Sequence, residues 1–231
     1  MTANSPANSH KALLAEIQAR VEVLPQPRVA DVRAVRREFS KKLKHADADL
    51  VFKLALSLLQ LRASWYRFVA YELVQHHPAT MAGLEVKAIE KLGAGMASWD
   101  EVDCFSCYLA GPAWRTRQID DRVVHRWAGL NDRWWRRAAL VATVPLNNKT
   151  RGGQGDSQRT LDVCRLLISD RDDMVVKAMS WALRELAKRD SAGVQSFLTE
   201  ERKTLAPRVV REVENKLATG LKNPKPRAAD R

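Results

Sequence analysis

The sequence predicts an all-α protein, specifically a right-handed α-solenoid of antiparallel helix pairs with a concave basic face. Apolar residues recur with the helical period along most of the chain, and no convincing alternating strand pattern is present. Short turns separate the helical stretches. A cation followed by small or apolar residues recurs at Arg67, Arg137 and Lys177, about 70 and then about 40 residues apart. The longer spacing is about twice the shorter one, and the helix around Trp99 falls near its middle. A period near 35–40 residues with two helices per unit is typical of HEAT-type arrays.

We expect a single helical repeat domain over residues 10–219, because 231 residues with 45% hydrophobic content suit one continuous core. Residues 1–9 are small and polar and are expected to form a disordered N-terminus. Residues 220–231 are expected to form a basic, mobile tail.

Helix boundaries follow from glycine, proline and capping residues. Pro25 and Pro27 separate the first two helices, and Gly93 ends the fifth. Gly111-Pro112 is expected to end the sixth, and the polar, glycine-rich stretch 147–156 is expected to form a loop. The expected helices are 11–24, 28–44, 47–60, 64–76, 80–92, 99–110, 118–128, 132–144, 157–169, 171–189, 192–198 and 205–217.

The charge balance favours a polyanionic partner. Lys and Arg number 39 against 27 Asp and Glu, a formal net charge of +12, which suits nucleic acid or an anionic membrane. The basic face of helix 28–44, with Arg33 and Arg36, is either solvated or lies against phosphate. No apolar run approaches the ~20 residues that a membrane-spanning helix needs, so DNA is expected rather than a membrane.

The three cysteines are expected to be free thiols in a reducing cytoplasm, because their number is odd and no cleavable apolar leader precedes the chain. Cys104 and Cys107 form a lone C-x-x-C inside a helix, which offers two metal ligands at most. We therefore interpret both as small buried residues and expect no metal and no cofactor.

Tryptophan is unusually frequent, with seven Trp against three Tyr. Trp99 and Asp103 are four residues apart and share one helix face. This stretch alone favours a core position for Trp99 beside a capping Asp100, and only the rest of the chain changes that interpretation. Trp134 and Trp135 are adjacent, so both cannot be buried on one helix stripe. One of them is expected to form a surface platform or to fill a groove between helices.

Cations accompany these indoles in successive units. Arg133 and Arg137 are four apart, and Lys177, Trp181 and Arg184 lie on one helix face. This recurrence favours a DNA-binding face over scattered core residues. The DNA-binding residues predicted here are Arg133, Trp134, Arg137, Lys177 and Arg184.

Three motifs resemble those of the AlkD-type DNA alkylation repair proteins, which are HEAT-like helical repeat DNA glycosylases. They are S-W-D-E-V-D (98–103), W-W-R-R-A-A-L (134–140) and K-A-M-S-W-A-L-R-E-L-A-K (177–188), of which the third is the most specific. The resemblance extends over most of the chain. The cysteine-containing run after the first motif and the long loop 147–156 depart from the family pattern.

The resemblance implies that Trp99 and Asp103 are the catalytic pair, that Trp181 is a second pocket aromatic, and that Arg137 and Arg184 hold the DNA backbone. A purine alkylated at N3 or N7 is a cation and leaves as a neutral base, so no general acid is needed. A carboxylate at Asp103 would stabilise the positive charge that grows on the sugar and orient water, and the indoles would add cation–π attraction.

The sequence therefore predicts a monomeric, monofunctional N-glycosylase for cationic N3-/N7-alkylpurines in double-stranded DNA, located in the cytoplasm. A non-catalytic HEAT-repeat protein that recognises distorted or branched DNA is the first alternative. A helical scaffold for an acidic protein, with Trp as interface anchors, is the second. Asp103 separates these alternatives from the enzyme, because a protein that only binds phosphate has no use for a carboxylate among cations.

Overall fold

The computed structural model describes residues 10–24, 26–61 and 63–224. The predicted disordered N-terminus 1–9 and the last part of the predicted tail, 225–231, lie outside the described residues. Within the described residues the chain forms helices and no strand. The elements are α1 (His10–Glu22), α2 (Val29–Lys42), α3 (Ala48–Leu59), α4 (Ser64–Gln75), α5 (Pro78–Ala82), α6 (Val86–Gly93), α7 (Trp99–Phe105), a π-helical turn (Ser106–Ala110), α8 (Gly111–Arg115), α9 (Asp121–Ala128), α10 (Arg133–Val141), α11 (Val144–Asn147), a 3-10 turn (Lys149–Arg151), α12 (Ser157–Leu166), α13 (Asp173–Leu186), α14 (Ser191–Glu201) and α15 (Pro207–Thr219).

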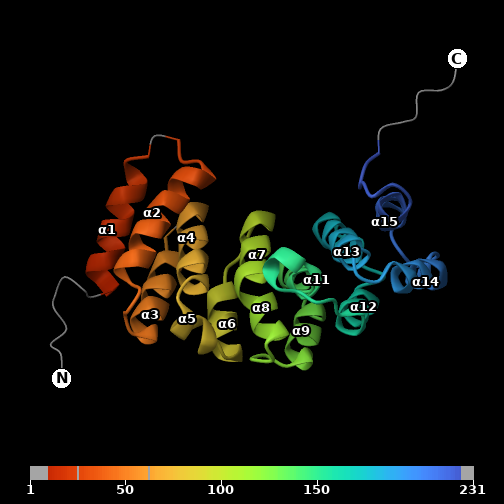
Figure 1. The fold of residues 1–231 in the computed structure, drawn as a ribbon, viewed down its shortest axis with the longest axis horizontal. Coiled ribbons are helices and arrows are strands. Elements are labelled where there is room, and N and C mark those ends of the chain that lie inside the picture. Colours follow the sequence, from red (N-terminus) through yellow and green to blue (C-terminus); the bar gives the residue numbers. More distant parts are fainter. Residues whose placement is uncertain (1–9, 25, 62, 225–231) are drawn as a thin grey trace, which may run out of the picture.

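The helices follow one another along the long axis of the molecule, from α1 to α15 (Figure 1). α2, α4, α7, α10, α13 and α15 form a row in which each helix contacts the next, and we call it the α2–α15 row. Helices α3, α9, α12 and α14 pack against α4, α10, α13 and α15 of that row. This arrangement confirms the predicted all-α solenoid. No helix in the described part of the chain combines the length and the apolar character needed to cross a membrane.

The core runs through the whole array and takes two of the tryptophans. Trp114 and Trp127 are completely or almost completely buried. Trp114 donates its indole N–H to Asp121 (2.7 Å), and Trp127 donates to Glu90 (2.9 Å), so neither indole leaves a buried polar group unpaired. These two residues are therefore structural.

The prediction that Gly111-Pro112 ends a helix is wrong. The chain continues from α7 through the π-helical turn into α8 without leaving helical backbone. Pro112 has no backbone N–H for an α-helical bond, and the wider π turn, in which Gly111 N donates to Ser106 O, carries the helix past it. A Cβ on Gly111 would lie 2.7 Å from Ala142 O, so glycine permits close packing against the next helices.

Other boundaries also differ from the prediction. The single helix expected over 80–92 is two helices, α5 and α6, because the chain turns at Gly83–Glu85 to bury Leu84 in the core. Helix α9 begins at Asp121, not at residue 118, because the Asp120 side chain accepts the N–H of Arg122 (2.9 Å) and caps it. The helix expected over 132–144 ends at Val141.

Arg36, on the basic face of the second helix, is not solvated, which excludes one of the two positions expected for that face. Its side chain is buried, and its Nε donates to Glu72 Oε2 (2.9 Å). Arg33 donates from its own Nε to the other oxygen of Glu72 (2.8 Å). A buried carboxylate on α4 thus holds two arginines of α2, because an unpaired charge would be costly there.

Candidate active site

Negatively charged side chains stabilise the N-terminal end of α7, where the helix dipole is positive. Asp100 and Glu101 lie in its first turn. Glu101 Oε2 accepts the N–H of Ala97 (2.8 Å) and lies 3.7 Å from the Nε of Arg67, a residue of α4. Arg67 is itself buried and donates to Ala94 O (3.1 Å). The first turn of α7, which carries Trp99, is therefore anchored to the rest of the fold.

Trp99 and Asp103 lie one turn apart on α7 and line the same cavity. Trp99 is 56% exposed, so it is not a core residue. The Asp103 side chain keeps 17% of its surface exposed. The cavity thus presents a carboxylate and an indole together to the outside.

Arg137 of α10 binds the carboxylate of Asp103 through two hydrogen bonds. Its Nε donates to Oδ1 and its Nη2 to Oδ2, each at 2.9 Å, which is the bidentate geometry of a strong ion pair. Its Nη1 donates to the carbonyl oxygen of Met174 (2.6 Å). The Arg137 side chain is only 6% exposed, and its charge is paired with Asp103 in this structure.

Burial raises the pKa of Asp103 above its ordinary value. The hydrogen bonds and the positive charge of Arg137 oppose this shift, while the negative charge of Asp100 adds to it. The carboxylate therefore sits in a partly desolvated place where its charge acts over a short distance on whatever enters the cavity.

The opposite wall of the cavity comes from α13. Trp181, Lys177 and Arg184 recur there at helical spacing, as the sequence predicted. The cavity has a volume of about 410 Å³. Its lining residues are Trp99, Asp103, Arg137, Met174, Lys177, Trp181, Arg184 and Lys222.

Two lining residues, Met174 and Lys222, were not singled out in the sequence. Lys222 follows α15 and approaches the buried carboxylate of Glu212 (3.4 Å). Glu212 accepts the hydroxyl of Ser180 (2.6 Å), which in turn accepts from the Nε of Arg184 (3.1 Å). Burial lowers the pKa of Arg184, and the charge of Glu212 opposes that change. The sequence did not point to Lys222, because residues 220–231 were expected to form a mobile tail with no fixed position near the cavity.

Two of the predicted DNA-binding residues, Arg133 and Trp134, do not line this cavity. Arg133 is exposed and pairs with Asp172 (3.2 Å), while Trp134 is half-buried against the core. Trp135 packs edge-on against Phe105, with ring centroids 5.8 Å apart, and also contacts Trp127. It is therefore Trp135 that fills a groove between helices, one of the two roles expected for this pair.

The cysteines and the acidic residues supply no metal centre in the described ranges, where no group of three or more His, Cys, Asp or Glu is placed to hold an ion. All three cysteines are free thiols. Burial raises the pKa of Cys107 and of Cys104 to about 12. Cys107 is buried as expected, whereas Cys104 is partly exposed.

Comparison with known proteins agrees with this architecture. The family model for DNA alkylation repair enzymes matches residues 27–217. A solved structure from Enterococcus faecalis, described as a predicted DNA alkylation repair enzyme, superposes with a TM-score of 0.70 at 18% sequence identity and covers 93% of this chain and 97% of that one. At this identity the likeness establishes the fold. No curated protein sequence matches the chain. Since the family match spans most of the chain, from α2 to α15, the protein belongs to the DNA alkylation repair enzyme family.

Proposed function

We propose that the protein is a monofunctional DNA N-glycosylase that hydrolyses the glycosidic bond of cationic N3- and N7-alkylated purines in duplex DNA. The observation that carries this proposal is the partly exposed carboxylate of Asp103, which lines one cavity together with the indoles of Trp99 and Trp181. The other charged residues of that cavity are cations. In the proposed reaction the alkylated base leaves as a neutral molecule and takes the bonding electrons with it.

Asp103 is the proposed catalytic residue. When the glycosidic bond breaks, positive charge develops on the deoxyribose, and a fixed carboxylate stabilises it directly. A carboxylate has about four lone-pair sites, and the bidentate bond from Arg137 uses one on each oxygen. The remaining lone pairs are available to orient the water that attacks the sugar carbon.

The indoles and cations would position the substrate. Trp99 and Trp181 offer flat π faces to a cationic nucleotide. Lys177 and Arg184 line the same cavity and would pair with backbone phosphates around the lesion. Arg137 is proposed as a positioning residue that orients Asp103, and a phosphate that enters the cavity would meet its remaining N–H groups. A monomer suffices in this scheme, because the catalytic group and the proposed DNA-binding residues lie on one chain.

The second candidate is a non-catalytic protein that binds distorted or branched DNA. The same Asp103–Arg137 pair favours it, because a carboxylate that holds a buried arginine also has a use in a protein that only binds DNA, which the sequence alone did not indicate. The two candidates differ in one product, which is the free base.

The test is release of 7-methylguanine and 3-methyladenine from methylated duplex DNA by the wild-type protein and by Asp103→Asn. The proposal expects release by the wild type and a loss of roughly 100- to 1,000-fold in the variant, the range typical for removal of a group that stabilises charge in the transition state. Equal release by both would remove Asp103 from the mechanism. Salt-sensitive DNA binding without any base release would favour the second candidate.

A further inference from the structure

A second cavity, larger than the one around Asp103, lies between the middle of α2, the end of α4, α5, the π-helical turn, α8 and the loop that follows α11. Its volume is about 540 Å³. Four guanidinium groups line it, and one carboxylate accompanies them. The excess of positive charge in a confined space makes the cavity an attractive place for an anion.

The carboxylate of this cavity, Glu72, is already used within the protein. It accepts from Arg33 through one oxygen (2.8 Å) and from Arg36 through the other (2.9 Å). Arg33 also donates to the hydroxyl of Tyr108 (3.2 Å) and lies over the ring of Phe68. One carboxylate cannot neutralise two guanidinium groups, so this wall of the cavity keeps a positive charge.

The opposite wall carries Arg115 and Arg151, which form no ion pair with a carboxylate anywhere in residues 10–24, 26–61 and 63–224. Arg115 donates to the carbonyl oxygens of Pro145 (3.4 Å) and of Arg151. Arg151 stacks over Tyr108, with its guanidinium carbon 5.2 Å from the ring centroid, and donates to Cys107 O at 3.5 Å. Neutral carbonyls orient these side chains but leave their charge available.

Arg151 belongs to the glycine-rich loop 147–156, which the proposed excision chemistry does not use. The loop is held by hydrogen bonds and by close backbone packing. Gly153 N donates to Asn148 O (2.9 Å), and a Cβ on Gly153 would lie 2.5 Å from Pro145 O. Asn147 donates its side-chain amide to Thr160 Oγ1 (2.9 Å). A rigid loop loses little conformational entropy when a ligand binds.

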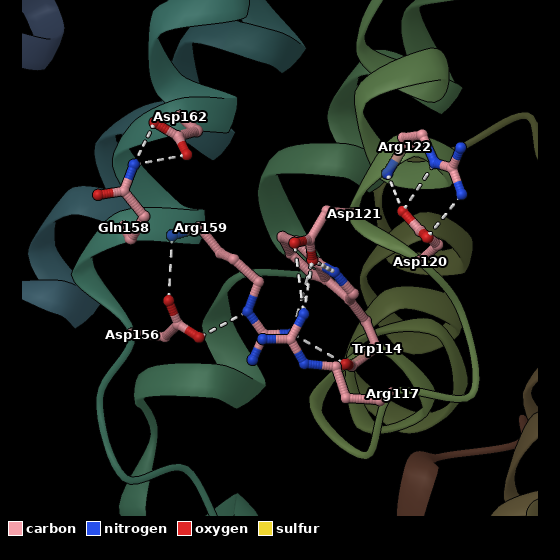
Figure 2. A network of polar contacts seen from close by, with 9 residues as sticks. All are labelled: Trp114, Arg117, Asp120, Asp121, Arg122, Asp156, Gln158, Arg159 and Asp162. Atoms are coloured by element: carbon pink, nitrogen blue, oxygen red, sulfur yellow. Dashed lines mark hydrogen bonds and ion pairs between the residues drawn. The ribbon is translucent and has the colours of Figure 1, made fainter.

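The far end of the loop is tied to α8 and α12 by the network drawn in Figure 2. Arg159 donates to Asp156 (2.6 Å) and to Trp114 O (2.9 Å), and its guanidinium lies over the Trp114 ring. Asp121 accepts the indole N–H of Trp114. The loop is thus clamped at both ends, which fixes where Thr150 and Arg151 project.

The two cavities lie along one continuous helical segment. Asp103 precedes Tyr108 by five residues and Arg115 by twelve, which at 1.5 Å per residue is roughly 8 to 18 Å along the helix axis. The grooves of B-DNA are about 6 Å and 12 Å wide. Helices of the α2–α15 row line both cavities, with α2 and α4 at the second and α7, α10 and α13 at the first. A duplex that lies along this row with a nucleotide at Asp103 would place backbone phosphates near the second cavity.

We infer that the cavity lined by Arg33, Arg36, Arg115 and Arg151, with Thr150 at its edge, binds a phosphate of the DNA backbone at a distance from the lesion. This inference rests on the proposed function in that it takes duplex DNA as the partner. Arg151 supplies the charge, and the clamped loop supplies the position. The site holds bound DNA in register and takes no part in bond cleavage.

The experiment measures binding of a short undamaged duplex at salt concentrations between about 50 and 200 mM. Arg151→Gln is expected to weaken binding roughly tenfold at 0.1 M salt and to reduce the slope of log K against log salt by about 0.9, the value for one phosphate contact. Arg151→Lys keeps the charge and is expected to keep most of the slope. The matched control is Arg122→Gln on α9, an exposed arginine paired with Asp120, which should leave the slope unchanged.

Thr150→Glu is a second variant, which tests whether an effect of Arg151→Gln comes from the lost charge or only from a disturbed loop. Thr150 is exposed, so a glutamate there adds negative charge at the cavity without removing an arginine. It should weaken duplex binding at least as much as Arg151→Gln. If both folded variants retain the wild-type slope, or if Arg122→Gln lowers it equally, the inference is overturned.

Two further arms separate related explanations. Stabilisation of the wild type, but not of Arg151→Gln, by inorganic phosphate together with unchanged duplex binding would assign the cavity to a small phosphate compound and overturn the assignment to DNA. Because the duplex is undamaged, base release plays no part in this test. Suppose the wild type releases no methylated base but Arg151→Gln lowers the salt slope as expected. The proposed glycosylase would then be refuted, and the phosphate site would still stand.

Discussion

Arg137 holds Asp103 through two parallel hydrogen bonds of 2.9 Å, one to each carboxylate oxygen. The pair joins α10 to α7 and is mostly buried on the arginine side and partly open on the aspartate side. An ion pair of this form fixes the direction of the carboxylate while leaving part of it accessible. The same contact thus serves the fold and, in the proposed mechanism, the orientation of the catalytic group.

Arg137→Ala is expected to destabilise the protein by about 3 kcal/mol, at the lower end of the range for breaking a buried ion pair, because Asp103 keeps some contact with water. The free energy of unfolding in urea measures this change. Arg133→Ala is the matched control on the same helix. Its exposed pair with Asp172 predicts a loss within about 1 kcal/mol. Equal losses in the two variants would contradict the structural role given to Arg137.

The pH dependence of base release should reveal the raised pKa of Asp103. The proposed mechanism needs the ionised carboxylate, so activity is expected to fall on the acid side at a pH above the ordinary range of an aspartate. The profile of single-turnover rate against pH measures this. An acid limb at or below the ordinary aspartate value would contradict the shift.

The same pKa shift affects stability with a definite sign. Because the folded-state pKa lies above the unfolded value, the contribution of Asp103 to stability is fully present below the unfolded pKa and is lost as pH rises through the folded pKa. The difference in unfolding free energy between wild type and Asp103→Asn should therefore change across that interval. A difference that stays constant with pH would argue that the pKa is the same in both states.

Trp99→Ala should affect base release far more than stability. The indole is 56% exposed, so its removal should cost little folding free energy, whereas loss of a cation–π contact of about 1–2 kcal/mol would slow release roughly 5- to 30-fold. Trp127→Ala is the opposite case. That indole is buried, and its loss should destabilise the fold by about 3–5 kcal/mol. Thermal unfolding and base release, measured together, distinguish the two patterns.

Gly153→Ala should weaken DNA binding by displacing the loop that carries Arg151. An added Cβ would lie 2.5 Å from Pro145 O and 2.6 Å from Leu146 O, so the loop must move. Gly129→Ala is the matched control, because its Cβ would meet only ordinary contacts at 3.5 Å or more. Unchanged binding of the undamaged duplex by Gly153→Ala would show that the loop position does not matter for DNA.

The helical fold was predictable because local signals agree with tertiary packing. Asp120, Asp132 and Asp172 each accept a backbone N–H at a helix start, as capping residues do. The prediction at Gly111-Pro112 was wrong for a physical reason. Proline ordinarily ends a helix, but here a π turn accommodates the missing hydrogen bond. The close packing of Gly111 against Ala142 is a tertiary contact, which the local sequence does not reveal.

The site was predictable only in part. Trp99 and Asp103 share a face by spacing alone, and the resemblance adds Trp181 and Arg184 on a helix far along the chain. The bond from Arg137 to Asp103 depends on how α7 and α10 pack, which spacing cannot give. Arg133 and Lys177 show the same limit, since both are cations beside tryptophan but only Lys177 lines the cavity.

The most direct test of the account compares base release and DNA binding in the same two proteins, wild type and Asp103→Asn. Asparagine keeps an oxygen that can accept from Arg137, so the variant is expected to fold, which circular dichroism checks. The account predicts that the variant binds alkylated duplex about as tightly as wild type but releases 7-methylguanine roughly 100- to 1,000-fold more slowly in a single turnover. If a folded Asp103→Asn protein releases 7-methylguanine at the wild-type rate, the account is contradicted.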